Sequence, residues 1–548
     1  MTIQRFFHVV ISTSALAVAC SASRPTPDAG SNDAATDAPV GITPCTVGAA
    51  GTSGLLLTGR LLLASGPITG ELLINAGGSI ACAAASCSAI SGYAAATRID
   101  CPTSVISPGL VNPHDHTDYA TVAPIDHDDV RYQHRNDWRT GAEGATPLPT
   151  VDNTSNTYVN AAAELRFVLG GTTSMVGSGG VKGLVRNLAA YDNTSLLEGL
   201  SGPVTFFDTF PLGDENGTLI TSGCAYPNIA SATDAFADGN YAPHIGEGIN
   251  LAGENELTCL TVANNDLVTS RTAIIHGVAV NAKDVDVVRQ SGASLVWSPR
   301  SNVSLYGDTA PVTEYRTAGI TISLGTDWLP TGSMNLLREL ACADSMNQKY
   351  FGGAFTDEDL WQMVTLNAAT AAGFDSQIGS LDVGKVADVT VFDANANADY
   401  RAVIAAGAED VHLVLRGGTL LYGDAAVVSA LSASCTSLDV CGNARAVCVD
   451  VPQVTLADAQ TSAASIYPLF FCSGQGPTSE PTCVPYRDTY PNGTSSTDFD
   501  GDGIPDTTDD CPKVFNPIRP MDNGVQSDVD GDGVGDACDN APLDPSSH

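Results

Sequence analysis

Two histidines two positions apart lie in the most informative stretch of this 548-residue sequence, Pro-Gly-Leu-Val-Asn-Pro-His-Asp-His-Thr-Asp-Tyr at 108–119. The apolar, β-branched residues Val105 and Ile106 before it predict a short strand that leads to His114 and His116. Residues two apart on a strand point to the same face, so both imidazoles can bind one metal ion. Taken alone, such a pair is more often two loop histidines without a function.

Further polar residues end apolar, strand-like runs downstream. His244 lies in Pro-His-Ile-Gly-Glu-Gly-Ile with Glu247 three residues on, His276 ends Ala-Ile-Ile-His, and Asp327 ends Leu-Gly-Thr-Asp. Neutral imidazoles with one carboxylate suit zinc or another first-row divalent ion. Three histidines and one aspartate would leave room for a water, whose pKa the metal lowers. A carboxylate such as Glu247 could then carry the proton to the substrate or leaving group. Each residue alone is usually structural; the ordered set indicates a metal-dependent hydrolase.

The elements that must position these residues alternate between strand-like and helix-like runs over 108–373. This alternation predicts a parallel sheet, and the stretch has the size of a (β/α)8 barrel, about 250 residues. The polar residues fall at the ends of predicted strands, where such barrels place their chemistry. The predicted strands are Thr172–Gly177, Val204–Phe210, Thr272–His276, Ser294–Trp297 and Thr321–Thr326. The predicted helices are Asn160–Leu169, Ala282–Ser291, Ser333–Met346 and Thr356–Ala372.

Strand-rich segments lie on both sides of this stretch, at 45–107 and 374–430. Short aliphatic runs broken by Gly and Pro predict a small β-domain in the first, and Val389–Phe392, Val411–Leu415 and Thr419–Tyr422 are predicted strands in the second. A Cys-rich segment, 431–496, has no assignable fold, and 497–548 is an acidic repeat.

The N-terminus predicts export. Residues 1–20 contain an early arginine and an apolar run too short to span a bilayer, which is typical of a signal peptide. Small residues before Cys20 resemble a bacterial lipoprotein signal, so Cys20 would carry the lipid. Residues 21–44 are predicted to be a disordered tether. The predicted location is the periplasm, the cell envelope or outer membrane as a lipoprotein, or the extracellular space.

Composition agrees with an exported protein. The chain has 24 basic and 61 acidic residues, a net charge of −37, which argues against nucleic acid or an anionic membrane surface as partner. Its 15 cysteines indicate an oxidising compartment, and without Cys20 an even number remains to pair. Four of them could staple the first β-segment: Cys45, Cys82, Cys87 and Cys101. We expect Cys259 and Cys342 to be small buried hydrophobic residues.

Several motifs in this order resemble the amidohydrolase superfamily, in its branch of cytosine deaminases, guanine deaminases and triazine hydrolases. The likeness covers roughly Gly54 to Gly423 and implies a barrel flanked by a small β-sandwich built from both sides of the barrel. The motifs are Pro-Gly-Leu-Val-Asn-Pro-His-Asp-His (108–116), His-Ile-Gly-Glu (244–247), Ile-Ile-His-Gly (274–277), Ser-Pro-Arg-Ser-Asn-Val-Ser-Leu-Tyr-Gly (298–307), Leu-Gly-Thr-Asp-Trp (324–328), Leu-Asn-Ala-Ala (366–369) and the segment 379–392.

The resemblance implies a role for each site residue. Glu247 would be the proton shuttle, His276 would hydrogen-bond the water or the substrate, and Asn302 would lie near the substrate. Asp327 would both bind the metal and help to activate the water. The implied metal ligands are His114, His116, His244 and Asp327.

The resemblance also bears on the number of metal ions. Binuclear members use a carboxylated lysine at a strand end, whereas Lys182, Lys283 and Lys349 end no apolar run, which favours one metal. Two departures from the family pattern concern local geometry: Pro113, and a weak strand pattern that ends in Pro243 before the third histidine.

Other basic side chains are less defined. Arg135 lies in an aromatic and charged loop after the first strand and could bind an anionic substrate group or be a solvated loop arginine. For His134 the same two roles stay open, binding the substrate or lying in a solvated loop. We expect His127 and His412 to be structural.

The acidic tail repeats one nine-residue pattern. Alternating carboxylates with glycines between them can wrap a hard cation, although a solvated acidic tail is the alternative. The two copies and the flanking residues resemble thrombospondin type 3 calcium repeats, which implies bound calcium and a Cys511–Cys538 disulfide. The implied calcium ligands are Asp498, Asp500, Asp502 and Asp506, then Asp528, Asp530, Asp532 and Asp536.

Together these features predict an exported hydrolase that uses one divalent transition metal, zinc first and iron or manganese next, on a non-peptide C–N bond of a small molecule. Deamination of a heterocycle and cleavage of an amide both fit. One alternative is a hydrolase that displaces chloride or an ester. Another is a non-catalytic, calcium-dependent surface binding protein. A membrane contact is expected only through the lipid anchor, and the sequence leaves the oligomeric state open.

Overall fold

The computed structural model describes residues 45–189, 194–262, 266–431, 435–449, 451 and 454–547. The predicted signal peptide with Cys20 and the predicted tether lie outside the described residues. Parallel strands alternate with helices in the central part of the chain, and a β-rich part accompanies them, so the predicted α/β class is confirmed. Among the described helices, none is both long and apolar enough to cross a bilayer.

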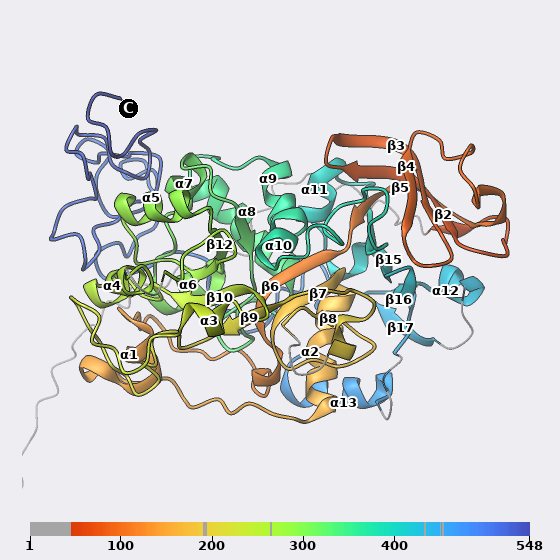
Figure 1. Ribbon diagram of the computed structural model, residues 1–548, viewed down its shortest axis with the longest axis horizontal. Coiled ribbons are helices and arrows are strands. Elements are labelled where there is room, and N and C mark those ends of the chain that lie inside the picture. Colours follow the sequence, from red (N-terminus) through yellow and green to blue (C-terminus); the bar gives the residue numbers. More distant parts are fainter. Residues whose placement is uncertain are drawn as a thin grey trace, which may run out of the picture. The chain divides into compact units, whose positions relative to one another are not determined.

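The β-rich part is a single ten-stranded sheet that collects strands from both sides of the central part (Figure 1). Strand β5 joins its halves, since it pairs with β2 on one side and with β14 on the other. Leu57 and Leu72 from one half share a buried core with Val391 and Leu413 from the other. The strands are β1 (Thr46–Val47), β2 (Leu55–Leu63), β3 (Gly66–Ile74), β4 (Ile80–Ala84), β5 (Thr97–Pro108), β14 (Val389–Asp393), β15 (Val411–Arg416), β16 (Thr419–Asp424), β17 (Thr436–Val440) and β18 (Asn443–Val447).

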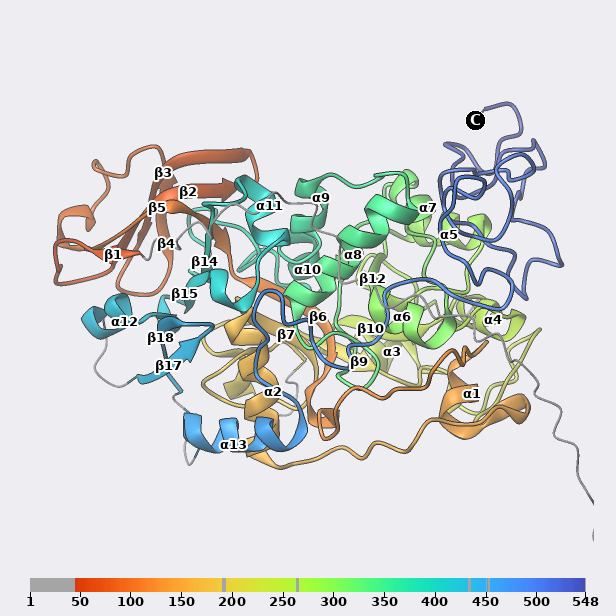
Figure 2. The same ribbon diagram turned by 180° about the vertical axis from the view of Figure 1, so that it is seen from behind.

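The Cys-rich segment 431–496, to which the sequence assigned no fold, belongs to this architecture. Its strands β17 and β18 extend the sheet through the β16–β18 pair, so the predicted boundary at 430 does not interrupt the sheet. Helix α13 (Leu456–Ile466) lies beside α2 (Thr157–Leu169) in both ribbon views (Figures 1 and 2).

The central part contains a three-stranded and a five-stranded parallel ladder, which together form a ring of eight strands that we call the barrel. The amide of Thr205 donates to Leu188 O at one junction, and at the other Asp327 exchanges backbone hydrogen bonds with His114 and His116. The strands are β6 (Leu110–His116), β7 (Thr172–Ser178), β8 (Arg186–Asn187), β9 (Val204–Asp208), β10 (Gly239–Ile245), β11 (Ala273–His276), β12 (Ser294–Trp297) and β13 (Ile322–Leu324).

Local sequence explains why the barrel elements begin and end where they do. Strand β12 is Ser-Leu-Val-Trp and buried throughout, as expected of a parallel strand covered on both faces. Helix α5 (Ala282–Ser291) begins at a capping box of Asn281 and Asp284 and ends at Gly292, whose φ of 75° suits a left-handed C-cap. The other helices are α1 (Arg135–Thr140), α3 (Ala232–Ala235), α4 (Leu251–Leu260), α6 (Pro299–Tyr306), α7 (Val312–Thr317), α8 (Leu336–Tyr350), α9 (Asp357–Gln362), α10 (Leu366–Ala371), α11 (Asp399–Ile404) and α12 (Ala425–Leu431).

Two local predictions differ from the structure. The predicted helix Thr356–Ala372 is two helices, α9 and α10, because the carbonyls of Met363 and Val364 turn outward to accept from the amides of Leu324 and Val111 on barrel strands. The segment before His244, which looked weak as a strand, is the regular strand β10, paired on both sides. In both cases the barrel ladder supplies hydrogen bonds that the local sequence does not show.

All fourteen cysteines among the described residues form disulfides. The expectation that Cys259 and Cys342 are unpaired was wrong, because each meets a cysteine from a distant segment. Cys45 and Cys101 join the edge strand β1 to β5, and Cys511–Cys538 is the bridge that the repeat resemblance implied. The pairs are Cys45–Cys101, Cys82–Cys87, Cys224–Cys259, Cys342–Cys483, Cys435–Cys448, Cys441–Cys472 and Cys511–Cys538.

Candidate functional site

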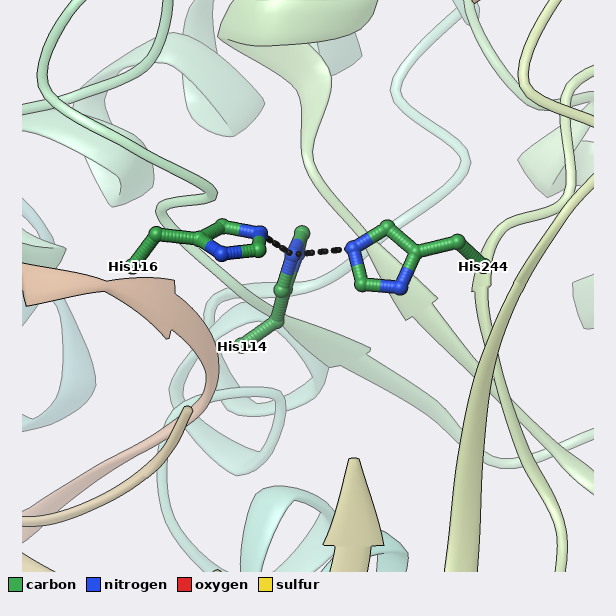
Figure 3. Close-up of side chains that lie close together, drawn as sticks. All are labelled: His114, His116 and His244. Carbon is green, nitrogen blue, oxygen red and sulfur yellow. Dashed lines mark hydrogen bonds between the residues drawn. The ribbon is translucent and has the colours of Figure 1, made fainter. Parts of the chain in front are cut away.

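Three histidines meet at the ends of two barrel strands. His114 and His116 come from the end of β6 and His244 from the end of β10. The Nε2 atom of His114 lies 3.3 Å from that of His116 and 3.1 Å from that of His244. Figure 3 shows the three rings with these nitrogens turned toward one another. The predicted histidine set therefore converges on one point.

Contacts of the outer nitrogens of two rings determine which nitrogen faces that point. The Nδ1 of His244 donates to the carbonyl oxygen of Asp208 at 3.0 Å, which leaves the lone pair of Nε2 directed at the other histidines. The Nδ1 of His114 lies 3.3 Å from the Ser298 hydroxyl. Such outer hydrogen bonds are typical of metal-ligating histidines, so this donor set fits a divalent transition metal.

Asp327 supplies the carboxylate of the same set. Its Oδ1 lies 3.5 Å from His114 Nε2 and 3.8 Å from His116 Nε2, and the Ser301 hydroxyl donates to its Oδ2. The backbone of Asp327 has a φ of 64°, which is uncommon for a residue other than glycine. His276 has the same unusual conformation, with a φ of 72°.

Burial controls the charge of these groups. It lowers the pKa of His116 to about 4, and together with the neighbouring imidazoles it lowers the pKa of His114 and His244 well below the usual range. Burial also raises the pKa of Asp327 well above its ordinary value. Neutral imidazoles offer free lone pairs at neutral pH, and a buried carboxyl next to them is stabilised as an anion by a bound cation.

Glu247 lies beside this set and is held by the Tyr306 hydroxyl, which Trp138 orients in turn. The hydroxyl of Tyr306 donates to Glu247 Oε1 at 2.7 Å, and the indole Nε1 of Trp138 donates to the Tyr306 oxygen at 2.9 Å. Burial raises the pKa of Glu247, while Arg135 and the Tyr306 hydroxyl oppose that shift. A buried carboxyl with a raised pKa is suited to accept and release a proton.

His276 lies between Glu247 and Asn302, the residue that was expected near the substrate. Its Nε2 lies 3.7 Å from Glu247 Oε2, and its Nδ1 lies 3.1 Å from the Asn302 amide nitrogen. In this orientation the amide donates, so Nε2 carries the proton and serves as a donor. One nitrogen of His276 also lies within 4.8 Å of ligand atoms of His114 and Asp327. The Asn302 Oδ1 is buried and has no hydrogen-bond partner, which leaves an acceptor in this region.

Arg135 has a different environment from both predicted alternatives. It is 1% exposed and its guanidinium donates to Asp214 at 2.7 Å and to the carbonyl of Thr209 at 2.9 Å. Its backbone amide donates to the carbonyl of Glu247 at 3.0 Å. Arg135 is therefore neither a solvated arginine nor free to bind a substrate anion; it braces the end of β10.

Three further histidines among the described residues hold structural positions. His134 caps α1 and lies 3.1 Å from the buried Glu256. His127 contacts the Ser304 hydroxyl at 3.0 Å, and His412 lies between Asp393 and Asp424.

The two acidic repeats fold into matching loops. In the first, the carboxylate of Asp498 accepts from the amides of Gly501 and Gly503; in the second, Asp528 accepts from those of Gly531 and Gly533. The four glycines have positive φ, which explains their place in the pattern. One oxygen from each of three carboxylates gathers within 4.8 Å in both loops: Asp498, Asp500 and Asp502, then Asp528, Asp530 and Asp532. Asp506 and Asp536 close the loops by accepting from the amides of residues 499 and 529.

Four site residues were not singled out from the sequence: Asp208, Ser298, Ser301 and Tyr306. The last three lie in the motif 298–307, so the signal was present, but only the fold shows which of its side chains reach the site. Asp208 contributes a backbone carbonyl, for which a sequence carries no signal.

Comparison with known families agrees with this geometry. Residues 243–421 match the amidohydrolase family, and residues 496–519 match the thrombospondin type 3 repeat, so both resemblances noted in the sequence are confirmed. The first match contains His244, Glu247, His276, Asn302 and Asp327. The two histidines of β6 lie before it and join the site through the fold.

The curated relatives align over part of their length. The 5-methylthioadenosine/S-adenosylhomocysteine deaminase of Teredinibacter turnerae is 32% identical over 137 residues, 24% of this chain and 31% of the relative. Guanine deaminase of Homo sapiens is 29% identical over 142 residues, 24% of this chain and 30% of the relative. The chain thus spans about a third of the length of the curated relatives it matches.

Among solved structures, an adenosine deaminase from Xanthomonas campestris with bound zinc has a TM-score of 0.49 and 16% identity, covering 76% of this chain and 98% of that chain. Atrazine chlorohydrolase from Arthrobacter aurescens TC1, complexed with zinc, has a TM-score of 0.49 and 18% identity, covering 67% of this chain and 95% of that chain.

Proposed function

We propose that this chain, whose residues 243–421 match the amidohydrolase family, is a metal-dependent hydrolase that cleaves a non-peptide C–N bond of a small molecule. The observation that carries the proposal is the convergence of three histidine Nε2 atoms beside two buried carboxyls. Deamination of a nitrogen heterocycle is the favoured reaction, because the aligned relatives are named as deaminases of such compounds.

One divalent metal would be held by His114, His116, His244 and Asp327, with zinc as the first candidate. When bound, such a metal would act as a Lewis acid that lowers the pKa of water. The chain's own residues would orient the ligands and transfer the proton. Ser301 orients the carboxylate of Asp327.

Proton transfer falls to Glu247. Its carboxyl is buried and its Oε1 is fixed by Tyr306, which leaves Oε2 to exchange a proton with the nucleophile and the leaving nitrogen. His276, oriented by Asn302, would donate a hydrogen bond to the substrate from Nε2.

We also propose that the two acidic loops bind calcium. The Oδ2 atoms of Asp500 and Asp530 are buried and have no hydrogen-bond partner, and the loops place several carboxylates together. A hard cation would offset that repulsion and complete the oxygen set.

Export is a further proposal, and it includes a lipid anchor on Cys20. Seven disulfides support it, because such bridges persist in oxidising compartments.

Elemental analysis of protein purified without chelator tests the metal site. We expect about one transition metal per chain, lost in His114→Ala and retained in His127→Ala, whose ring lies outside the converging set. Wild-type protein should then release ammonia from members of a panel of heterocyclic amines and amides. Two metals per chain would contradict the role of His276 as a hydrogen-bond donor, and no transition metal would contradict the hydrolase.

A further inference from the structure

The segment after the Cys342–Cys483 disulfide lies against the barrel near the end of α6. Both ribbon views place the C-terminal coil beside α5 and α7 (Figures 1 and 2). The contacts centre on residues 306–309, which we call the α6 turn. This turn begins with Tyr306, the residue whose hydroxyl holds Glu247.

We call residues 484–547 the tail; they include the acidic loops, and three residues near their start cap the end of α6. The guanidinium of Arg487 donates to the carbonyl of Tyr306 at 2.6 Å and to that of Tyr132 at 3.0 Å. The amide of Tyr486 and the hydroxyl of Tyr490 both donate to the carbonyl of Gly307. The last carbonyls of a helix lack partners within the helix, so these donors satisfy groups that would otherwise need water.

The approach is close because residue 307 is glycine. Its φ is 70°, and a Cβ built there would lie 2.0 Å from the carbonyl oxygen of Tyr486. The tail backbone therefore packs directly on the helix end rather than on a side chain.

Arg519, between the two acidic loops, holds the rest of the turn. Its Nε lies 3.0 Å from Oδ2 of the fully buried Asp308, and its Nη2 donates to the carbonyl of Thr309 at 3.1 Å. Its Nη1 donates at 3.1 Å to the carbonyl of Val278, two residues beyond His276. One tail arginine thus holds two segments that flank the site.

We propose that Arg487 and Arg519 are positioning residues of the hydrolase site: they fix the α6 turn and thereby hold the Tyr306 hydroxyl against the Glu247 carboxylate. The inference rests on the proposed function, since it assigns the tail a task in proton transfer by Glu247. It follows from a chain of contacts in which each step is a hydrogen bond, from Arg487 to Tyr306 and from Tyr306 to Glu247. A displacement of about 1 Å in a catalytic group can cost about a hundredfold in rate.

A double-mutant cycle in the full-length holoenzyme tests this. Arg487→Gln and Tyr306→Phe should each lower kcat about tenfold with KM changed less than about twofold, since Glu247 stays in place but is less well oriented. The double variant should be no slower than the slower single variant. Losses that multiply, or an Arg487→Gln effect confined to KM, would overturn the proposal.

Arg338→Gln is the matched control. Arg338 also ties this part of the chain to the barrel, through Glu480, but it does not contact the α6 turn. Its kcat should match that of wild type. An equal loss of kcat would mean that any loosening of the tail lowers activity, and the proposal would fail.

Hydrogen exchange separates this inference from the proposed function. Peptides covering residues 303–309 should exchange faster in Arg487→Gln and in Arg519→Lys than in wild type or Arg338→Gln. This readout needs no substrate, so a chain without hydrolase activity would refute the proposed function while the exchange still reports the coupling. Unchanged exchange in both variants would refute the coupling itself.

Discussion

At the scale of single residues, the site depends on backbone conformations that the side chains do not favour. His276 and Asp327 both have left-handed φ values at barrel strand ends. Each such conformation costs about 1–3 kcal/mol and persists only where the surroundings impose it. For Asp327 the surroundings are the backbone hydrogen bonds to His114 and His116. The same bonds that close the barrel therefore set the direction of its carboxylate.

Glu247→Gln should lower kcat by about a hundredfold or more, because the amide keeps the shape of the carboxyl but cannot take up a proton. Metal content should stay the same, since Glu247 is not among the ligands. Ammonia release and elemental analysis of the same preparation check both statements. Glu254→Gln on α4, whose carboxylate faces Asn281, is the control and should retain full activity. Loss of metal from Glu247→Gln would make Glu247 a ligand instead of a shuttle.

At the scale of elements, α1 braces the strand that carries the third histidine. It lies in the loop after β6, yet Arg135 at its start reaches the carbonyls of Thr209 and Glu247. The guanidinium of Arg135 pairs with Asp214 and lies 3.6 Å from Glu256, and both of these carboxylates are fully buried. The loop after the first barrel strand thus orders the end of β10.

Arg135→Met should destabilise the protein by about 3–5 kcal/mol, because it leaves the buried carboxylates of Asp214 and Glu256 without their cation. The midpoint of urea unfolding measures this loss. Arg289→Met serves as the control, since its partner Asp286 is a surface ion pair worth about 0–1 kcal/mol. Equal midpoints for the two variants would show that the buried network contributes no more than a surface pair.

At the scale of the whole molecule, the acidic tail is held by one disulfide and by amide hydrogen bonds to its carboxylates instead of a large apolar core. Cys511–Cys538 closes it, and carboxylates outnumber apolar side chains in its loops. Without calcium, burial and neighbouring carboxylates raise the pKa of Asp500 to about 8. The same two causes, burial being the larger, raise the pKa of Asp502 to about 7. In the unfolded chain both should titrate near the ordinary value of about 3.9.

The calcium-free tail should therefore lose stability as the pH rises from about 4 to about 8, since over this range the folded state binds more protons than the unfolded state. Calcium should restore stability most at the upper end, where the carboxylates are ionised. The rate of tail proteolysis at pH 5 and pH 8.5, with and without calcium, measures both effects. Asp500→Asn with Asp502→Asn should flatten the pH dependence. A calcium-free tail that gains stability with pH would contradict the proposed loops.

Short-range patterns along the chain identify the residue types of the site and the local elements that carry them. Imidazoles and carboxylates at the ends of apolar runs, capping residues such as Asn281 and the repeated aspartates of the tail are readable because they depend on neighbours a few positions away. Such patterns identified His114, His116, His244 and Asp327 as candidates and placed β12 and α5 at their observed bounds.

The folded structure alone reveals the features that depend on distant partners. It paired Cys259 with Cys224 and Cys342 with Cys483, buried Arg135 in an ion-pair network, and divided the predicted helix 356–372 to cap barrel strands. It also brought Tyr306 to Glu247 and the tail to the α6 turn. These contacts join residues up to hundreds of positions apart, and a local pattern carries no information on them because their energies arise only when the chain has closed on itself.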